Sequence, residues 1–324
     1  MSEVDELRAA QHFIEQGMPA QAQEILSRLY QSKSPAIALN AGLSLLAALD
    51  HVRQNDALLG ITDRCIGIAS ALGKRHIHAF LLVQKAEFLF RKMSHLLYQG
   101  QNLKLAANVF RWIDFSLQED KSEYAALAEE RKRLESDISA LEATARKELE
   151  ANPDHYFQGK ILMGLAELSF SRFMYDLGVL VDAGRWKSKI MNLHCVRRWN
   201  LDKLIGYDRA ARRKLRNSFR DATLLYKKAL DEFSAGQYES DAAHAAYGLA
   251  LKHAFTFRFT NATKFLNQAK SMANKDRDKN LFNRIEDLEK LIKDRYRHPR
   301  NWVEEFGWDL PRALRNQNHP KREP

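Results

Sequence analysis

The placement of proline constrains the fold of this 324-residue chain more than any other feature of its sequence. Two long tracts, 36–152 and 154–298, contain none of the seven prolines. A proline inside a helix costs about 3 kcal/mol, so tracts without it are compatible with long helices. Apolar residues recur in them at helical spacing, as at Leu134, Ile138 and Leu141, and no sustained period-2 segment predicts a strand. The sequence therefore predicts an all-α protein.

Glycines divide the proline-free tracts into a series of helices. Helix C-caps favour glycine, and the glycines at or near the expected breaks are Gly17, Gly73, Gly100, Gly184 and Gly236. The predicted helices lie near 3–17, 19–32, 35–54, 56–72, 75–99, 102–118, 121–151, 155–182, 208–235, 238–255, 257–273 and 277–296. Short connections predict antiparallel hairpins stacked as a solenoid, with longer irregular helices in the middle. An irregular helical bundle is the alternative.

The first predicted hairpin places small and large apolar residues at a regular spacing. Counted from Glu3, Ala10 and Ala22 occupy positions 8 and 20, and Leu26 occupies position 24. Small residues let two helices approach closely, and larger apolar residues fill the space to the next hairpin. Pro35 comes one place later than the proline of the usual repeat. This pattern resembles a degenerate tetratricopeptide repeat (TPR), and the resemblance implies a solenoid of helical hairpins.

Two repeat phases compete in the C-terminal half. The first spans 222–255 and has Ala229, Gly236 and Tyr238 around its turn. The second, offset by 21 residues, instead brings four residues into register: Ala250, Ala262, Leu266 and Ala269. Both phases cannot form complete units, and we expect hairpins over 222–255 and 258–296.

These features predict five regions along the chain. They are an N-terminal helical repeat region (1–118), a long helical hairpin (119–183), a basic segment (184–220), a C-terminal helical repeat region (221–296) and a docking tail (297–324). The tail holds four of the seven prolines together with Trp302, Phe306 and Trp308. Because exposed tryptophans on a free tail are unusual, we expect these aromatic residues to dock. They would cover the last hairpin as a cap or, as the alternative, bind a partner.

The positive charge of the chain is concentrated in one segment. The formal net charge of the chain is +10. Residues 185–220 hold twelve basic and two acidic residues, so the net charge of this segment equals that of the whole chain. The candidate residues for binding a partner or polyanion are Arg197, Arg198, Arg209, Arg212, Arg213, Arg216 and Arg220. The last five fall within about 100° of arc on one helix. A separate apolar stripe on the same helix is predicted to pack inward: Ala211, Leu215, Phe219, Ala222 and Tyr226.

Three explanations of this arginine row remain open. The arginines could be solvated or could pair with the acidic helix 119–150, which has ten acids and six bases. They could instead bind an acidic protein surface. The third explanation is nucleic acid, because Trp186, Trp199 and Tyr207 are interleaved with the cations and could stack on bases.

Catalytic and metal motifs are incomplete. The segment 67–74, GIASALGK, has five residues between its glycines where a phosphate loop has four, and Arg75 stands where Ser or Thr would bind magnesium. Cys65, His76 and His78 lack a fourth ligand for zinc. We therefore expect no metal, no cofactor and no enzymatic activity.

An all-α nuclease was weighed separately. Nucleases of the HEPN superfamily carry an arginine and a histidine with four to six residues between them. Arg91 and His95 have only three residues between them, and Arg312 and His319 lie in the proline-bounded tail. Neither pair fits the pattern well.

The remaining expectations concern location and function. The sequence shows no secretory signal, no uncharged apolar segment of membrane length and only two cysteines, so we expect a cytoplasmic protein that does not bind membranes. The predicted function is a non-enzymatic TPR-like adaptor or scaffold that binds another protein within a larger complex. The alternative is a nucleic-acid-binding helical subunit of a nucleoprotein assembly that uses segment 185–220.

Overall fold

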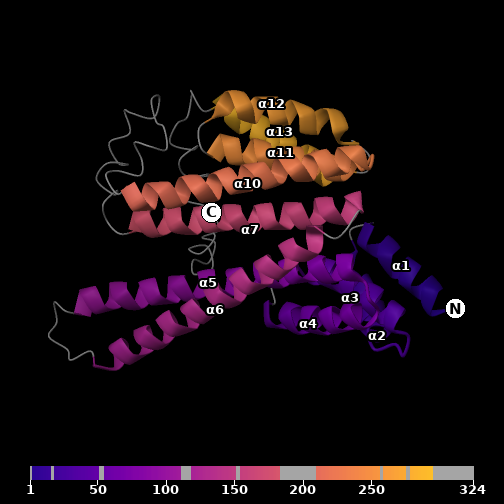
Figure 1. The fold of residues 1–324 in the computed structure, drawn as a ribbon, viewed down its shortest axis with the longest axis horizontal. Coiled ribbons are helices and arrows are strands. Elements are labelled where there is room, and N and C mark those ends of the chain that lie inside the picture. Colours follow the sequence, from indigo (N-terminus) through magenta and orange to yellow (C-terminus); the bar gives the residue numbers. More distant parts are fainter. Residues whose placement is uncertain are drawn as a thin grey trace, which may run out of the picture. The chain divides into compact units, whose positions relative to one another are not determined.

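A computed structural model describes the chain over residues 2–15, 18–50, 55–110, 118–150, 154–182, 209–255, 258–274 and 278–294 (Figure 1). Every regular element in these ranges is an α-helix. The predicted all-α class is therefore confirmed for the part of the chain that the structure describes.

The chain divides into two compact units, residues 1–157 (unit 1) and 158–324 (unit 2). The helices of unit 1 are α1 (Glu3–Glu15), α2 (Pro19–Leu29), α3 (Pro35–Asp50), α4 (Asn55–Ala71), α5 (Arg75–Phe110) and α6 (Gln118–Glu150). Helix α7 (His155–Asp182) begins at the boundary, and unit 2 continues with α10 (Arg209–Ala235), α11 (Glu239–Phe255), α12 (Phe259–Met272) and α13 (Lys279–Asp294).

Helices pack against their neighbours in sequence order. In unit 1 this holds from α1 to α6, and α1 also contacts α3. In unit 2 it holds from α10 to α13, and α11 also contacts α13. Contacts between a helix and the next two along the chain are compatible with a helical repeat.

Local sequence signals mark several helix ends. Pro19 and Pro35 are the first residues of α2 and α3, where the missing N–H of proline is harmless. The Asp154 carboxylate accepts hydrogen bonds from the backbone N–H groups of Tyr156 and Phe157 at the start of α7. Gly73 follows α4 with φ of 63°, a left-handed conformation that favours glycine. These signals explain why the predicted helix ends agree closely with the observed ones.

The predicted break at Gly100 is wrong. Helix α5 runs without interruption from Arg75 to Phe110 and packs against α6. The pairs Lys92–Glu130 and His78–Glu148 show that the two helices are antiparallel. A glycine inside a helix costs about 1 kcal/mol, which the packing of a long helical pair readily offsets. Gly17 and Gly184 lie outside the described residues.

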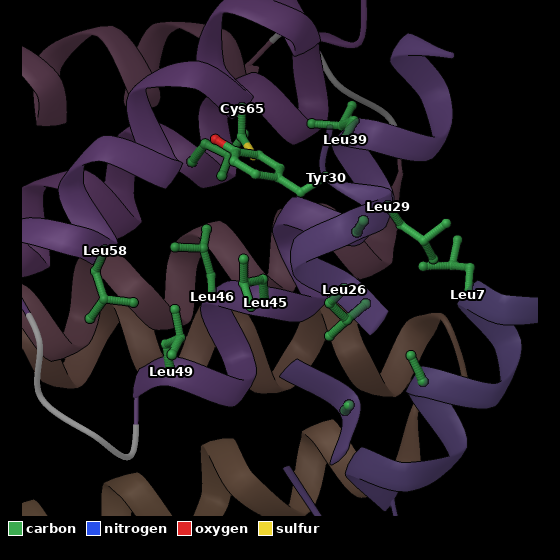
Figure 2. Packing of buried hydrophobic residues seen from close by; sticks show 14 of the residues in the cluster. Leu7, Leu26, Leu29, Tyr30, Leu39, Leu45, Leu46, Leu49, Leu58 and Cys65 are labelled. Carbon is green, nitrogen blue, oxygen red and sulfur yellow. The ribbon is translucent and has the colours of Figure 1, made fainter. Parts of the chain in front are cut away.

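The core of helices α1–α5 is apolar (Figure 2). Ala10 and Ala22 are completely buried between α1 and α2, as the repeat spacing requires. Further along, Tyr30 lies beside Cys65, and both side chains approach Gly42 so closely that an added Cβ would lie 2.3 Å from the Cys65 Sγ. Small residues thus set the spacing of these helices.

Glycines also allow close helix packing in unit 2. A Cβ added at Gly159 of α7 would lie 2.5 Å from the Phe233 ring, and one added at Gly248 of α11 would lie 2.4 Å from the Tyr226 ring. Helix α11 contacts both α10 and α12. Residues of both predicted repeat phases are consequently buried, including Ala229, Ala250, Ala262, Leu266 and Ala269.

Candidate partner-binding surface

Helix α10 separates its residues into a buried face and an exposed face. Phe219, Ala222 and Tyr226, from the predicted apolar stripe, are all buried. The buried face continues through Leu225, Ala229, Leu230 and Phe233. Because these residues fix the inward side of α10, the side chains on the opposite side point into solvent.

The exposed side of α10 carries most of the described arginine row. We call the exposed cations of this helix the basic face: Arg213, Lys214, Arg216, Arg220, Lys227 and Lys228. Arg209 and Arg212 belong to α10, but their side chains lie outside the described residues. Segment 183–208 with Arg197 and Arg198, and the aromatic residues Trp302, Phe306 and Trp308, also lie outside them.

The basic face is longer than the predicted arginine row. At 100° per residue, Arg213, Arg220, Leu224 and Lys227 fall within about 60° of arc, and they extend over about 21 Å of helix. Leu224 is the most exposed large apolar residue of the described chain, at 52%. Sequence reasoning ended the row at Arg220 and missed the continuation to Lys227 and Lys228, which the same helical spacing would have found.

Several of these cations form no ion pair with the described residues of unit 2. Within its described residues, no carboxylate forms an ion pair with Arg213, Arg220 or Lys227. Two carboxylates of α6 form ion pairs inside unit 1, through Lys92 and His78. Pairing between the arginine row and helix 119–150 stays a prediction.

A further exposed arginine contacts α10. The Arg258 guanidinium, at the start of α12, is 5.5 Å from the centre of the Phe219 ring of α10. Burial lowers the pKa of His253 to about 4, and the positive charges of Arg258 and Lys227 act in the same direction. Cations from α10 and from the start of α12 therefore both act on His253 of α11.

A buried polar network holds α10 from its inner side. Lys252 of α11 is almost completely buried, and its Nζ donates a hydrogen bond to the Tyr226 Oη at 2.6 Å. The same ammonium lies 3.3 Å from a carboxylate oxygen of Glu167 on α7. The Tyr226 hydroxyl also donates to Glu167. We call these three residues the Lys252 network.

The ammonium of this network is stabilised by aromatic rings as well. The Lys252 Nζ lies 4.1 Å from the centre of the Tyr226 ring and 4.4 Å from that of Phe170. Burial lowers the pKa of Lys252, while the Glu167 carboxylate opposes this effect. Because the network joins α7, α10 and α11, it fixes the rotation of α10 and hence the direction of the basic face.

The sequence held a signal for this network that its analysis did not use. Lys252 and His253 interrupt a stretch of α11 that is otherwise almost wholly apolar, and Glu167 interrupts a similar stretch of α7. Charges in such stretches need partners when they are buried. Which residues form the partners could not be read from the sequence, since Glu167 and Lys252 are 85 positions apart.

The residues weighed as a metal site do not form one. In the part of the chain that the structure describes, no three His, Cys, Asp or Glu side chains are placed to hold a metal ion. Burial raises the pKa of the Cys65 thiol to about 11, so the thiolate needed for ligation is disfavoured. His78 instead contacts the Glu148 carboxylate.

Comparison with known proteins adds no relative. No protein-family model matches the chain, and no curated protein matches it significantly.

No helix in the described ranges combines the length and apolar character that crossing a bilayer requires.

Proposed function

We propose that this chain is a non-enzymatic, TPR-like helical adaptor of the cytoplasm, and that it holds a partner protein within a larger assembly through the basic face of α10. The observation that carries the proposal is the exposure of Arg213, Arg220 and Lys227 on one side of a rigidly packed helix, with no described carboxylate of unit 2 paired to them. The sequential packing of antiparallel helices supports it, because such scaffolds present extended binding surfaces.

The partner surface is expected to be acidic. A row of cations steers an acidic surface toward it and disfavours basic partners. Leu224 adds an apolar contact within the same row, which a protein partner can cover. Together these features favour a protein over a partner that binds through charge alone.

Affinity purification with a charge-reversed variant tests the proposal. The full chain is isolated from its native cells with bound proteins, which are quantified by mass spectrometry. The double variant Arg213→Glu/Arg220→Glu is expected to lose a specific partner at least tenfold. The matched control is Arg131→Glu/Arg133→Glu, because both arginines are exposed on α6 of unit 1. A protein that remains a solitary monomer, or equal loss in both variants, contradicts the proposal.

Nucleic-acid binding is the second candidate function. The length of the basic face, about 21 Å from Arg213 to Lys227, favours it because this length meets more than one phosphate. An electrophoretic mobility shift at 50 and 200 mM salt tests it. Binding that falls steeply with salt and is lost in Arg213→Glu/Arg220→Glu, but kept in the α6 control, would support this function.

A further inference from the structure

We infer that the segment docking on the basic face is an acidic amphipathic α-helix that packs one apolar side chain against Leu224. The inference rests on the proposed function and specifies the chemistry of its partner. Its basis is the order of charged, polar and apolar residues along the exposed side of α10.

The exposed side of α10 presents a straight stripe suited to a second helix. Arg213, Asn217, Arg220, Leu224 and Lys227 are all exposed, and they are separated by four, three, four and three positions. We call them the docking stripe. This alternation keeps residues aligned along a helix, as in the seam between two packed helices. A straight partner helix can therefore follow the stripe over its whole length of about 21 Å.

Leu224 occupies a special place in this stripe. Its side chain is 52% exposed, and Arg220 and Lys227 lie one helical turn before and after it. Lys228 lies one turn away on its other side. The aliphatic stems of such cations extend the apolar surface around a leucine. A partner that covers Leu224 thus excludes water from an apolar patch while its carboxylates meet the surrounding cations.

Acidic residues of α10 limit which polyanion fits. Asp221 borders the stripe and Asp231 continues it one turn beyond Lys227, and both are exposed. A phosphate backbone, which is uniformly negative, is repelled at both places and gains nothing from Leu224. A peptide helix can place a neutral or basic residue opposite Asp231 instead. These acids favour a protein helix over nucleic acid.

The surface is also rigid enough to bind without rearrangement. Tyr226, which follows Leu224 by two positions, points inward and is held by Lys252 and Glu167. The inner side of α10 is thereby fixed at the same level as the centre of the docking stripe. Preorganisation of this kind lowers the entropic cost of association.

Fluorescence anisotropy with the full chain and three labelled probes tests the inference. The first probe is an 18-residue helical peptide with glutamates spaced to meet Arg213, Arg220 and Lys227 and one leucine on the same side. The second has the same composition with its leucine on the opposite side. The third is a 20-nucleotide single-stranded DNA. The first peptide is expected to bind at least fivefold more tightly than the second and more tightly than the DNA.

Variants separate the apolar contact from the charges. Leu224→Ser is expected to remove the difference between the two peptides, and Leu224→Ala to reduce it. Leu72→Ser is the matched control, because Leu72 is an exposed leucine of unit 1. Arg220→Glu is expected to weaken both peptides at least tenfold. All three positions are exposed, so circular dichroism is expected to show unchanged helix content.

Each contrary outcome has a distinct meaning. Equal affinity for the two peptides, or no effect of Leu224→Ser, overturns the inference and leaves the proposed function standing if Arg220→Glu still weakens binding. Failure of both peptides to bind, or binding unaffected by Arg220→Glu, overturns the basic face as the docking surface and with it the proposed function. Tighter binding of the DNA overturns the inference in favour of the nucleic-acid function.

Discussion

The core of helices α1–α5 and the core of unit 2 are built on different principles. The core of helices α1–α5 is apolar, and its fully buried hydroxyl, that of Thr62, donates to the backbone carbonyl of Leu58 in its own helix. The core of unit 2 contains an ammonium and an imidazole, Lys252 and His253, at its centre. The polar partners of Lys252 come from two other helices.

The two kinds of core contribute differently to the stability of the fold and to the selection of one helix arrangement. An apolar core gains from burying area and tolerates changes that keep its volume. A buried ammonium adds little net stability, but it excludes arrangements of α7, α10 and α11 that leave it unpaired. Unit 2 carries the basic face, and a fixed orientation of α10 keeps that face pointing in one direction.

Leu26→Ala is expected to lower the free energy of unfolding by about 3 kcal/mol at all pH values between 5 and 9. Leu26 of α2 is completely buried in the apolar cluster of helices α1–α5, so the substitution leaves a cavity that no titratable group can relieve. Urea denaturation followed by circular dichroism measures the loss. Hydrogen exchange should show the loss of protection in α1–α4. A loss below 1 kcal/mol would contradict a tightly packed apolar core.

Glu167→Ala is expected to cost about 2 kcal/mol, because it leaves the buried Lys252 ammonium without its carboxylate. The cost is below the 3–5 kcal/mol of a fully buried pair, since Glu167 is half exposed. Lys252→Met removes the charge and is expected to stay within about 1 kcal/mol of the natural protein. The double variant should recover most of the loss seen in Glu167→Ala.

The matched control for this network is Glu289→Ala. Glu289 pairs with Lys270 and Lys293 near the surface of α12 and α13. Surface pairs contribute little, so a change below about 0.5 kcal/mol is expected. If Glu167→Ala costs no more than this control, the Lys252 network does not fix the packing of unit 2.

Acid is expected to destabilise unit 2 through His253. Its pKa is lowered from 6.5 to about 4 in the folded chain, so the unfolded chain takes up the proton first as pH falls. The contribution is present above pH 6.5 and is lost as pH falls from 6.5 to 4. We expect a loss of at least about 1.5 kcal/mol, which is less than half of what the full shift of the pKa converts to.

His253→Phe should abolish this part of the acid dependence. The new ring can keep the stacking on Phe265 and the contact with Phe219. Urea denaturation at pH 7 and pH 4.5 measures the difference between the variant and the natural protein. The lowered pKa of His244 acts in the same direction in both proteins, so it leaves this difference unchanged. An equal acid dependence in both would contradict the prediction.

Alkaline pH is expected to act on the two units with opposite signs. The pKa of Cys65 is raised from 9.0 to about 11, so unit 1 loses stability as pH rises from 9 to 11, about 1 kcal/mol by pH 10. Tyr30, whose pKa is also raised by burial, adds to this loss. The pKa of Lys252 is lowered from 10.5, so its contribution instead becomes more favourable as pH rises toward 10.5.

Two variants separate these effects. Cys65→Ala should lose less stability than the natural protein between pH 8 and 10, and Lys252→Met should lose more. Urea denaturation at both pH values measures each difference. Shifts of the same sign in the two variants would show that the buried groups do not distinguish the units in this way.

The helices were largely predictable because their signals are local. Pro153, Asp154 and the apolar spacing after them place the start of α7 at residue 155, where the structure has it. Gly100 misled the prediction, because the cost of one glycine is smaller than the gain from packing α5 along α6. The helix preference of one residue could not reveal that α5 packs against α6, which begins only at residue 118.

For the basic face, helical spacing in the sequence predicts the exposed residues of α10 but not the contacts from other helices. The 3.6-residue period alone placed Arg213, Arg216 and Arg220 together, and the structure finds all three exposed. The same period continues to Leu224 and Lys227, which the sequence analysis passed over. Arg258 could not be found in this way, because it reaches α10 through the fold of α11 and α12.

The helical character of this chain, most of its helix ends and the charged side of α10 follow from the amino-acid sequence alone. These properties depend on residues within a few turns of one another, whose geometry the helix fixes. The packing of the helices brings Lys252, Tyr226 and Glu167 together and brings Arg258 to the Phe219 ring. Such contacts join residues 26 to 85 positions apart, and their formation depends on how whole helices pack.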